Sequence, residues 1–200
     1  MDGAPGGEIC SRDRLNTLDA IHTRQSIGKG KPEPVPRELV EQILSAAAQA
    51  PNHHRVRPWR FFVLTGVARE RLGDAFAAAF RKREPDANDE LVAVQRSKAL
   101  RSPLLIVVAV DKPTESKVLE IENVCAAAAA VQNLLLAAHA LGLAAKWNTG
   151  PNALDPDVKA FFGLAPDQHL IAFVHIGYPL AEPPPISRPS FEDRTVWMES

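Results

Sequence analysis

The sequence predicts a single α+β domain, in which helices and strands are mixed but do not alternate regularly. Two continuous apolar runs, residues 104–110 and 170–176, have the length and composition of strands that are covered on both faces. Residues 115–141 form the longest helical pattern, and from Cys125 onward this pattern is apolar on nearly all sides, which predicts burial all round. The 200 residues, 46% of them hydrophobic, suffice for one sizeable core. We therefore expect a fold with about three layers.

In the first half of the chain, prolines and apolar spacing mark the boundaries of the elements. Apolar residues at helical spacing predict a short helix ending near Thr23, and Pro36 opens a second helix that Pro51 terminates. The apolar run after Pro58 predicts a strand, and two further helical patterns follow on either side of a polar break. The expected elements are helices at 15–23, 36–49, 68–83 and 89–100 and a strand at 59–65.

The second half contains the two buried strands and the long helix, with two shorter elements between them. A short strand at 143–147 follows the long helix. Asp155 as N-cap, Pro156 in the first turn and Gly163 just past the end bound a small helix. Because the long helix is both central and apolar all round, we expect it to be shared with a second subunit of a homodimer.

Composition divides the chain into three parts. Residues 1–14 are polar and lack the apolar region of a secretory signal, so we expect a disordered extension there. Residues 15–178 form the folded domain. Residues 179–200 are rich in proline and extended, yet they end in Phe191 and Trp197, so we expect this tail to pack on the domain or on a partner subunit.

Several function classes are excluded by charge and motif content. The net charge is −1 and no broad basic stripe exists, so we expect no nucleic-acid binding. The long helix is rich in alanine and only weakly hydrophobic, so we read it as a core helix and expect no membrane span. Cys10 and Cys125 have no redox or metal spacing, which fits a reducing, cytoplasmic location, and we expect Cys125 to be a small buried hydrophobe. The histidines lack neighbouring carboxylates or thiols, so no metal site is expected.

Two cationic segments are the candidate sites. Arg24 and Ser26 lie just past a helix end, where a forked donor and a hydroxyl suit a phosphate group, although cations also favour a solvated helix C-terminus. Residues 51–60 combine two histidines and three arginines beside a core strand. A cationic loop next to a strand suits an anionic, flat, aromatic cofactor. His53 could instead only cap the preceding helix.

These segments resemble motifs of the nitroreductase family, in the same order along residues 15–197. Arg24-Gln25-Ser26 is similar to the family's N-terminal Arg-Arg-Ser element, and Ala50-Pro51-Asn52-His53 followed by Pro58-Trp59-Arg60-Phe61 is similar to its Ala-Pro loop and Pro-Trp-x-Phe strand. The segment from Ala138 through Gly142 to Trp147-Asn148-Thr149-Gly150 resembles the end of the long helix and the strand beside the flavin. Phe173-x-x-Ile176-Gly177-x-Pro179 resembles the last strand.

The resemblance implies a three-layer α-β-α sandwich with a mostly antiparallel sheet and an FMN-dependent homodimer, with a flavin at each interface. It implies hydride transfer from NADH or NADPH through flavin N5 to a nitroaromatic, quinone or activated-alkene acceptor, with no side chain required as acid or base. The loop at Asn52 would reach the partner's flavin. The cofactor-binding residues it implies are Arg24, Gln25, Ser26, Gln49, Asn52, His53, Trp147, Asn148, Thr149, Gly150 and Arg188.

The chain departs from the family pattern at three positions. Gln25, Gly28 and Asn148 stand where basic residues are common, with Lys29 or Lys31 available to compensate. Two alternatives therefore stay open: a flavin-binding carrier or sensor without turnover, and an α/β interaction module that binds another anion or a protein.

Overall fold

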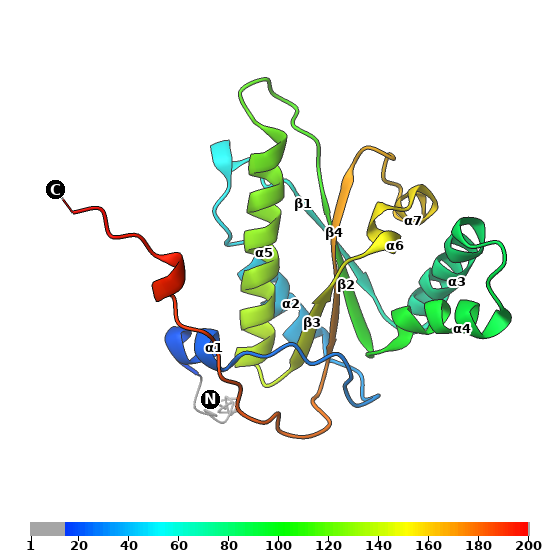
Figure 1. The fold of residues 1–200 in the computed structure, drawn as a ribbon, viewed down its shortest axis with the longest axis horizontal. Helices are drawn as coiled ribbons and strands as arrows, with labels where there is room; N and C mark the ends of the chain where they lie inside the picture. Colours follow the sequence, from blue (N-terminus) through cyan, green and yellow to red (C-terminus); the bar gives the residue numbers. More distant parts are fainter. Residues whose placement is uncertain (1–14, 200) are drawn as a thin grey trace, which may run out of the picture.

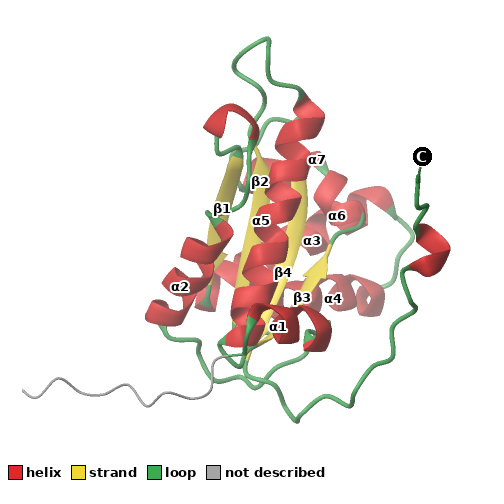
Figure 2. Ribbon diagram, turned by 90° about the vertical axis from the view of Figure 1, so that its left-hand side faces the viewer, coloured by secondary structure: helices red, strands yellow, loops and turns green. Residues whose placement is uncertain are grey.

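The fold is a four-stranded antiparallel sheet with helices on both faces (Figures 1 and 2), as seen in a computed structural model that describes residues 15–199. The strands are β1 (Trp59–Leu64), β2 (Leu104–Val110), β3 (Ala144–Asn148) and β4 (His169–Gly177), in the spatial order β1-β2-β4-β3. Every neighbouring pair is antiparallel. The predicted α+β class and layered architecture are confirmed.

One face of the sheet is covered by α2 (Arg37–Ala47) and the long helix α5 (Glu120–Ala140), which lie in front of the strands in Figure 2. Alternate residues of each strand point to this side because the side-chain period of a strand is two. The short helix α1 (Thr17–Thr23) lies near the C-terminal end of α5. The residues that form this half of the core include Ile43, Ile106, Val108, Leu134, Val174 and Ile176.

The opposite face is covered by α3 (Gly66–Arg83), α4 (Asp89–Ser97), α6 (Pro151–Leu154) and α7 (Pro156–Phe161). Phe76 of α3 meets Phe173 of β4 edge to face, with ring centroids 5.2 Å apart. Both faces of β2 are therefore packed, and all seven of its residues are buried, as its continuous apolar sequence predicts.

Two boundaries and one additional helix are the main differences from the sequence-based expectation. The long helix begins at Glu120 rather than at Glu115, because the Glu122 carboxylate accepts from the Leu119 N–H at 3.0 Å and caps the helix there. The fourth helix ends at Ser97 and is followed by a separate 3₁₀ turn, Lys98–Leu100. The one-turn helix α6 was not predicted, since four residues are too few for any periodicity to be visible.

The helix α5 is buried on one side only. It packs on the sheet through residues such as Val131 and Leu134, but Ile121 keeps 63% of its surface exposed and Cys125 is exposed as well. The prediction of a buried Cys125 is therefore wrong for a single chain, because nothing among residues 15–199 covers this side. By length and apolar composition, α5 is the one described helix that could cross a membrane. A core helix of a sheet protein can have the same length and composition, and 44% of the most apolar stretch of α5 is buried inside the domain.

The tail after β4 first follows α1 and then leaves the domain (Figure 1). Gln25 Nε2 donates to the Pro184 carbonyl at 2.6 Å, and Arg188 Nη2 donates to the Arg24 carbonyl at 2.6 Å. Beyond this point the side chains of Phe191 and Trp197 keep 64% and 76% of their surface exposed. The predicted extension at residues 1–14 lies outside the described residues, and the domain limits stay a prediction.

Candidate functional site

The segment after α1 is held along the free edge of β3. Edge strands leave one row of backbone N–H and C=O groups open to pairing. The Ile27 N–H donates to the Ala145 carbonyl at 3.0 Å, Ser26 forms a parallel bridge with Ala145, and the Lys31 N–H donates to the Tyr178 carbonyl at 2.8 Å. This pairing fixes the segment from Arg24 to Lys31 beside the strand that carries Trp147 to Gly150.

Arg24 and Arg188 form a pair of guanidinium groups at one end of this edge. The Arg24 side chain is half-buried, and its Nη1 is buried with no hydrogen-bond partner. Burial, and then the charge of Arg188, lower the pKa of Arg24. Among residues 15–199, neither guanidinium forms an ion pair with a carboxylate. Two adjacent cations with an unused donor are a site for an anion such as a phosphate.

The imidazole of His139, near the end of α5, lies beside Arg24. Its Nε2 is 2.8 Å from the Thr23 hydroxyl, which itself donates to the Asp19 carbonyl. Burial, and then the Arg24 charge, lower the pKa of His139. Thr23 and His139 border a cavity of about 700 Å³, which is also lined by Gln25 and by the proline-rich tail, including Glu182. The predicted residues Arg24, Gln25 and Arg188 are therefore brought together.

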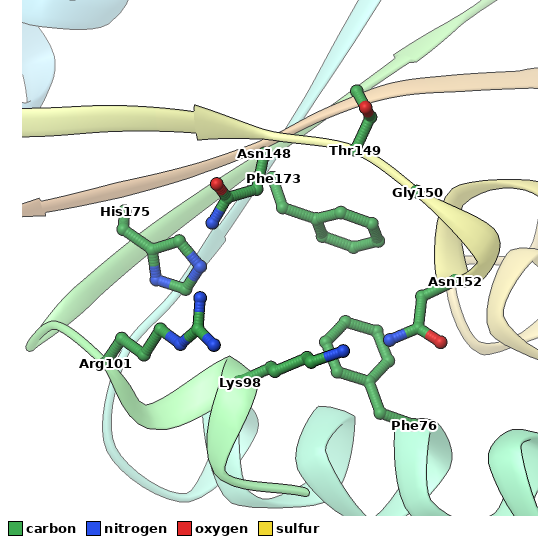
Figure 3. Close-up of a pocket in the computed structure, with 9 residues that line it drawn as sticks. All are labelled: Phe76, Lys98, Arg101, Asn148, Thr149, Gly150, Asn152, Phe173 and His175. Atoms are coloured by element: carbon green, nitrogen blue, oxygen red, sulfur yellow. The ribbon is translucent and has the colours of Figure 1, made fainter. Parts of the chain in front are cut away.

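A second, smaller pocket of about 290 Å³ lies at the C-terminal end of β3 (Figure 3). Its walls come from α3, the turn after α4, β3, α6 and β4. No carboxylate is among the lining residues, so the pocket is cationic. Burial, and then the charges of Arg101 and Arg83, lower the pKa of Lys98. The lining residues are Phe76, Lys98, Arg101, Asn148, Thr149, Gly150, Asn152, Phe173 and His175.

The end of β3 separates this pocket from a third cavity on the α5 side. Trp147 lines that cavity, and its indole Nε1 donates to the Ile171 carbonyl at 2.8 Å. Thr149 and Gly150 border both cavities. Gly150 has φ +105°, a conformation that favours glycine, so the chain can turn into α6 at this point. The predicted set Trp147, Asn148, Thr149 and Gly150 therefore lines two adjacent cavities at one end of the sheet.

Lys146 occupies the space that Gly28 leaves open. A Cβ atom at position 28 would lie 2.9 Å from Cδ of Lys146 and 3.6 Å from its Nζ. A larger side chain at position 28 would displace the lysine. Lys146 therefore places a positive charge beside position 28.

The loop with Asn52 and His53 lies far from Arg24 within one chain. His53 Nε2 is 3.8 Å from the Glu122 carboxylate in the first turn of α5, whereas Arg24 lies beside His139 in its last turn. Glu122 and His139 are 17 residues apart in α5, or about 25 Å along the helix axis. The structure does not bring Gln49, Asn52 and His53 to the other predicted residues of the same chain. Gln49 is exposed, its side chain donating to the Ser45 carbonyl at 3.4 Å.

This loop is held by internal hydrogen bonds and has a strained backbone. The Asn52 side-chain oxygen accepts from the Arg57 N–H at 2.8 Å, and its amide nitrogen donates to the Ala50 carbonyl. His54, Arg55 and Arg57 all have positive φ, between 48° and 58°. Such residues cost about 1–3 kcal/mol each and cluster at functional sites. Asn52 therefore has a clear structural role in shaping the loop, and Trp59, which follows the loop, is buried in the core.

The site residues missed by the sequence reasoning include Lys98, Arg101, His139, Lys146 and His175. Lys98 and Arg101 form a basic pair immediately before a buried strand, and His175 is a polar residue inside an otherwise apolar strand. Both patterns are visible in the sequence. His139 carries no such signal, because a histidine in an alanine-rich helix is equally expected on its surface.

The fold and the paired cavities define a protein of the nitroreductase type, and comparison with known proteins bears this out. The family model described as "Nitroreductase family" matches residues 21–178, and the chain belongs to this family. It is 31% identical over 181 residues to "Putative NAD(P)H nitroreductase YfhC" of Bacillus subtilis, covering 90% of this chain and 93% of that one. It is 30% identical to "Putative NAD(P)H nitroreductase YdjA" of Escherichia coli, covering 82% and 89%.

Solved structures agree with the sequence comparison. A nitroreductase-like family protein from Bacillus cereus superposes with a TM-score of 0.82 at 26% identity, covering 92% of this chain and 96% of that one. The crystal structure of a "putative nitroreductase in complex with fmn" from Desulfovibrio desulfuricans gives a TM-score of 0.72 at 28% identity, covering 93% and 98%.

Proposed function

We propose that the chain is an FMN-dependent oxidoreductase that uses NADH or NADPH. The observation that carries this proposal is the buried, unpartnered Nη1 of Arg24 beside Arg188, a pair that forms no ion pair with a carboxylate of residues 15–199. A phosphate would satisfy that donor and relieve the repulsion between the two guanidinium groups. The relatives named for NAD(P)H and the neighbour solved with FMN support the same cofactors.

The residues present fit the rest of the cofactor as well. Arg24, Arg188 and the Ser26 hydroxyl would hold the phosphate and ribityl chain, and the ring system would lie along the β3 edge towards Trp147 to Gly150. Lys98, Arg101 and Lys146 would then stand near the pyrimidine end, where negative charge develops on reduction. When bound, the flavin supplies the hydride chemistry between a nicotinamide and an acceptor. The chain's own residues bind and orient the ring and stabilise charge, and no side chain is needed to move a proton.

We further propose that the working unit is a homodimer and that the acceptor is a nitroaromatic, a quinone or an activated alkene. The uncovered side of α5, with Ile121 and Cys125, lies beside the loop of Asn52 and His53. The tail also carries Phe191 and Trp197 uncovered. A partner copy would cover both surfaces and would place the loop, which one chain leaves about 25 Å from Arg24, at the other subunit's flavin. A cytoplasmic location stays a prediction.

The visible spectrum of the protein with added FMN, before and after anaerobic NADPH or NADH, tests the proposal. Bound flavin that bleaches with the nicotinamide supports a turnover enzyme. Bound flavin that does not bleach with either nicotinamide favours the carrier or sensor. A protein that gains no bound flavin refutes the proposal and leaves the interaction module.

A further inference from the structure

His175 is a buried polar side chain near the C-terminal end of the central strand β4. Only 4% of its surface is exposed, and it lies opposite Lys146 of β3 and Leu105 of β2. Its ring points to the α3 side of the sheet and forms one end of the 290 Å³ pocket, where Figure 3 places it near Asn148 and Arg101. A histidine at such a position requires partners for both ring nitrogens.

The hydrogen bonds around Ser102 determine which nitrogen carries the proton. Ser102 Oγ is 2.8 Å from the Leu104 carbonyl, to which it donates, and 3.2 Å from Nδ1 of His175. A hydroxyl has one proton, so the second contact must be donated by the imidazole Nδ1–H. Burial, followed by the charges of Arg101, Lys146 and Arg69, lowers the pKa of His175 to about 4. The ring is therefore neutral at pH 7, and its Nε2 carries an unused lone pair.

The pocket thus combines one neutral acceptor with cationic donors. Lys98 and Arg101 can only donate, and no carboxylate lines the pocket. A carboxylate would also accept a hydrogen bond, but it would pair with these cations and cancel their positive potential. A neutral imidazole accepts without that effect. A complementary ligand edge offers an N–H to the imidazole and carbonyl oxygens to the cations, and the imide edge of an isoalloxazine ring carries these groups.

We propose that Nε2 of His175 accepts the N3–H of the flavin, while Lys98 and Arg101 donate to its flanking carbonyl oxygens. Ser102 acts as a positioning residue, because it fixes the Nδ1–H tautomer. The proposal rests on the proposed function and specifies how this chain recognises the pyrimidine edge of the flavin. It predicts that a substituent on N3 weakens flavin binding and that this discrimination depends on His175.

The test compares FMN with 3-methyl-FMN, which lacks the N3 proton, in wild-type protein and in two variants. Dissociation constants are measured by flavin fluorescence. We expect His175→Leu to bind FMN about three- to tenfold more weakly, as the loss of one neutral hydrogen bond implies. We expect the wild type to bind 3-methyl-FMN at least tenfold more weakly than FMN, His175→Leu to discriminate much less, and His175→Gln, whose amide oxygen can accept, to restore discrimination.

Control measurements distinguish this role from a structural one. Arg37→Met, on the exposed face of α2 and away from the cavities described, should leave both affinities unchanged. Nitrogen NMR of the wild-type protein should show a protonated Nδ1 and an unprotonated Nε2 on His175, and FMN should move the Nε2 resonance. Because this measurement uses only the wild-type protein, it does not depend on whether the variants fold. An Nε2–H tautomer, or equal affinities for the two flavins in the wild type, would overturn this proposal and leave the proposed function standing. Failure to bind FMN at all overturns both this proposal and the proposed function.

Discussion

The Arg24 side chain provides the sharpest test, because its removal should have opposite effects on the flavin complex and on the apoprotein. Arg24→Met keeps the apolar stem and removes the charge. In the complex this change deletes a charge-assisted hydrogen bond, which is worth about 1.5–3 kcal/mol. We therefore expect FMN affinity to fall about ten- to hundredfold.

The apoprotein should respond differently to the same substitution. Arg24 Nη1 has no partner, and Arg188 lies close enough to lower the Arg24 pKa, so the apoprotein loses no ion pair when the guanidinium is removed. We expect the free energy of unfolding without flavin to stay the same or to rise by on the order of 1 kcal/mol, the cost of an unsatisfied buried donor. Inorganic phosphate should stabilise the wild-type apoprotein more than the variant.

Fluorescence titration with FMN and urea denaturation of the apoprotein measure the two effects. Arg37→Met is the matched control, since Arg37 is an exposed arginine on α2 that pairs only with Glu41 and lies outside the cavities described here. It should change neither quantity appreciably. An unchanged FMN dissociation constant for Arg24→Met would exclude Arg24 from the phosphate site. A strongly destabilised apoprotein would make Arg24 a structural residue instead.

Three further predictions concern the loop, the buried histidine and the assembly. His53→Ala should lower the flavin midpoint potential and slow reduction by NAD(P)H with little change in melting temperature; a stability loss of about 1 kcal/mol with an unmoved potential would make His53 a helix-end cap. Because the pKa of His175 falls from an ordinary 6.5 to about 4 on folding, the unfolded chain binds more protons between these values, so stability should rise with pH there. Relative to His175→Leu, the wild type should lose about 2 kcal/mol of unfolding free energy between pH 7.5 and pH 5, and parallel pH profiles would contradict this. Light scattering should give a dimer at micromolar concentration, with a large interface over α5 of about 2,000 Å² or more; a monomer would remove the loop from the site.

The sequence by itself determined the elements whose signals are local. The apolar run 104–110 indicated a strand covered on both faces, and Asp155-Pro156 with Gly163 bounded a small helix. The ordered motifs from Arg24 to Pro179 were enough to indicate the family. These signals work because caps, prolines and apolar periodicity act over a few residues.

Tertiary structure decided which charged groups share a site. Lys146 fills the space beside Gly28, and Lys98 and Arg101 meet His175, although these residues come from elements far apart in the chain. Pairing across strands sets such contacts, and periodicity within one element carries no information about them. The exposure of Cys125 was missed for the same reason, since the sequence of a helix shows that a face is apolar but not which part of the protein or of a partner covers that face. The tautomer of His175 likewise follows from a single hydroxyl, that of Ser102, which lies 73 residues away in the sequence.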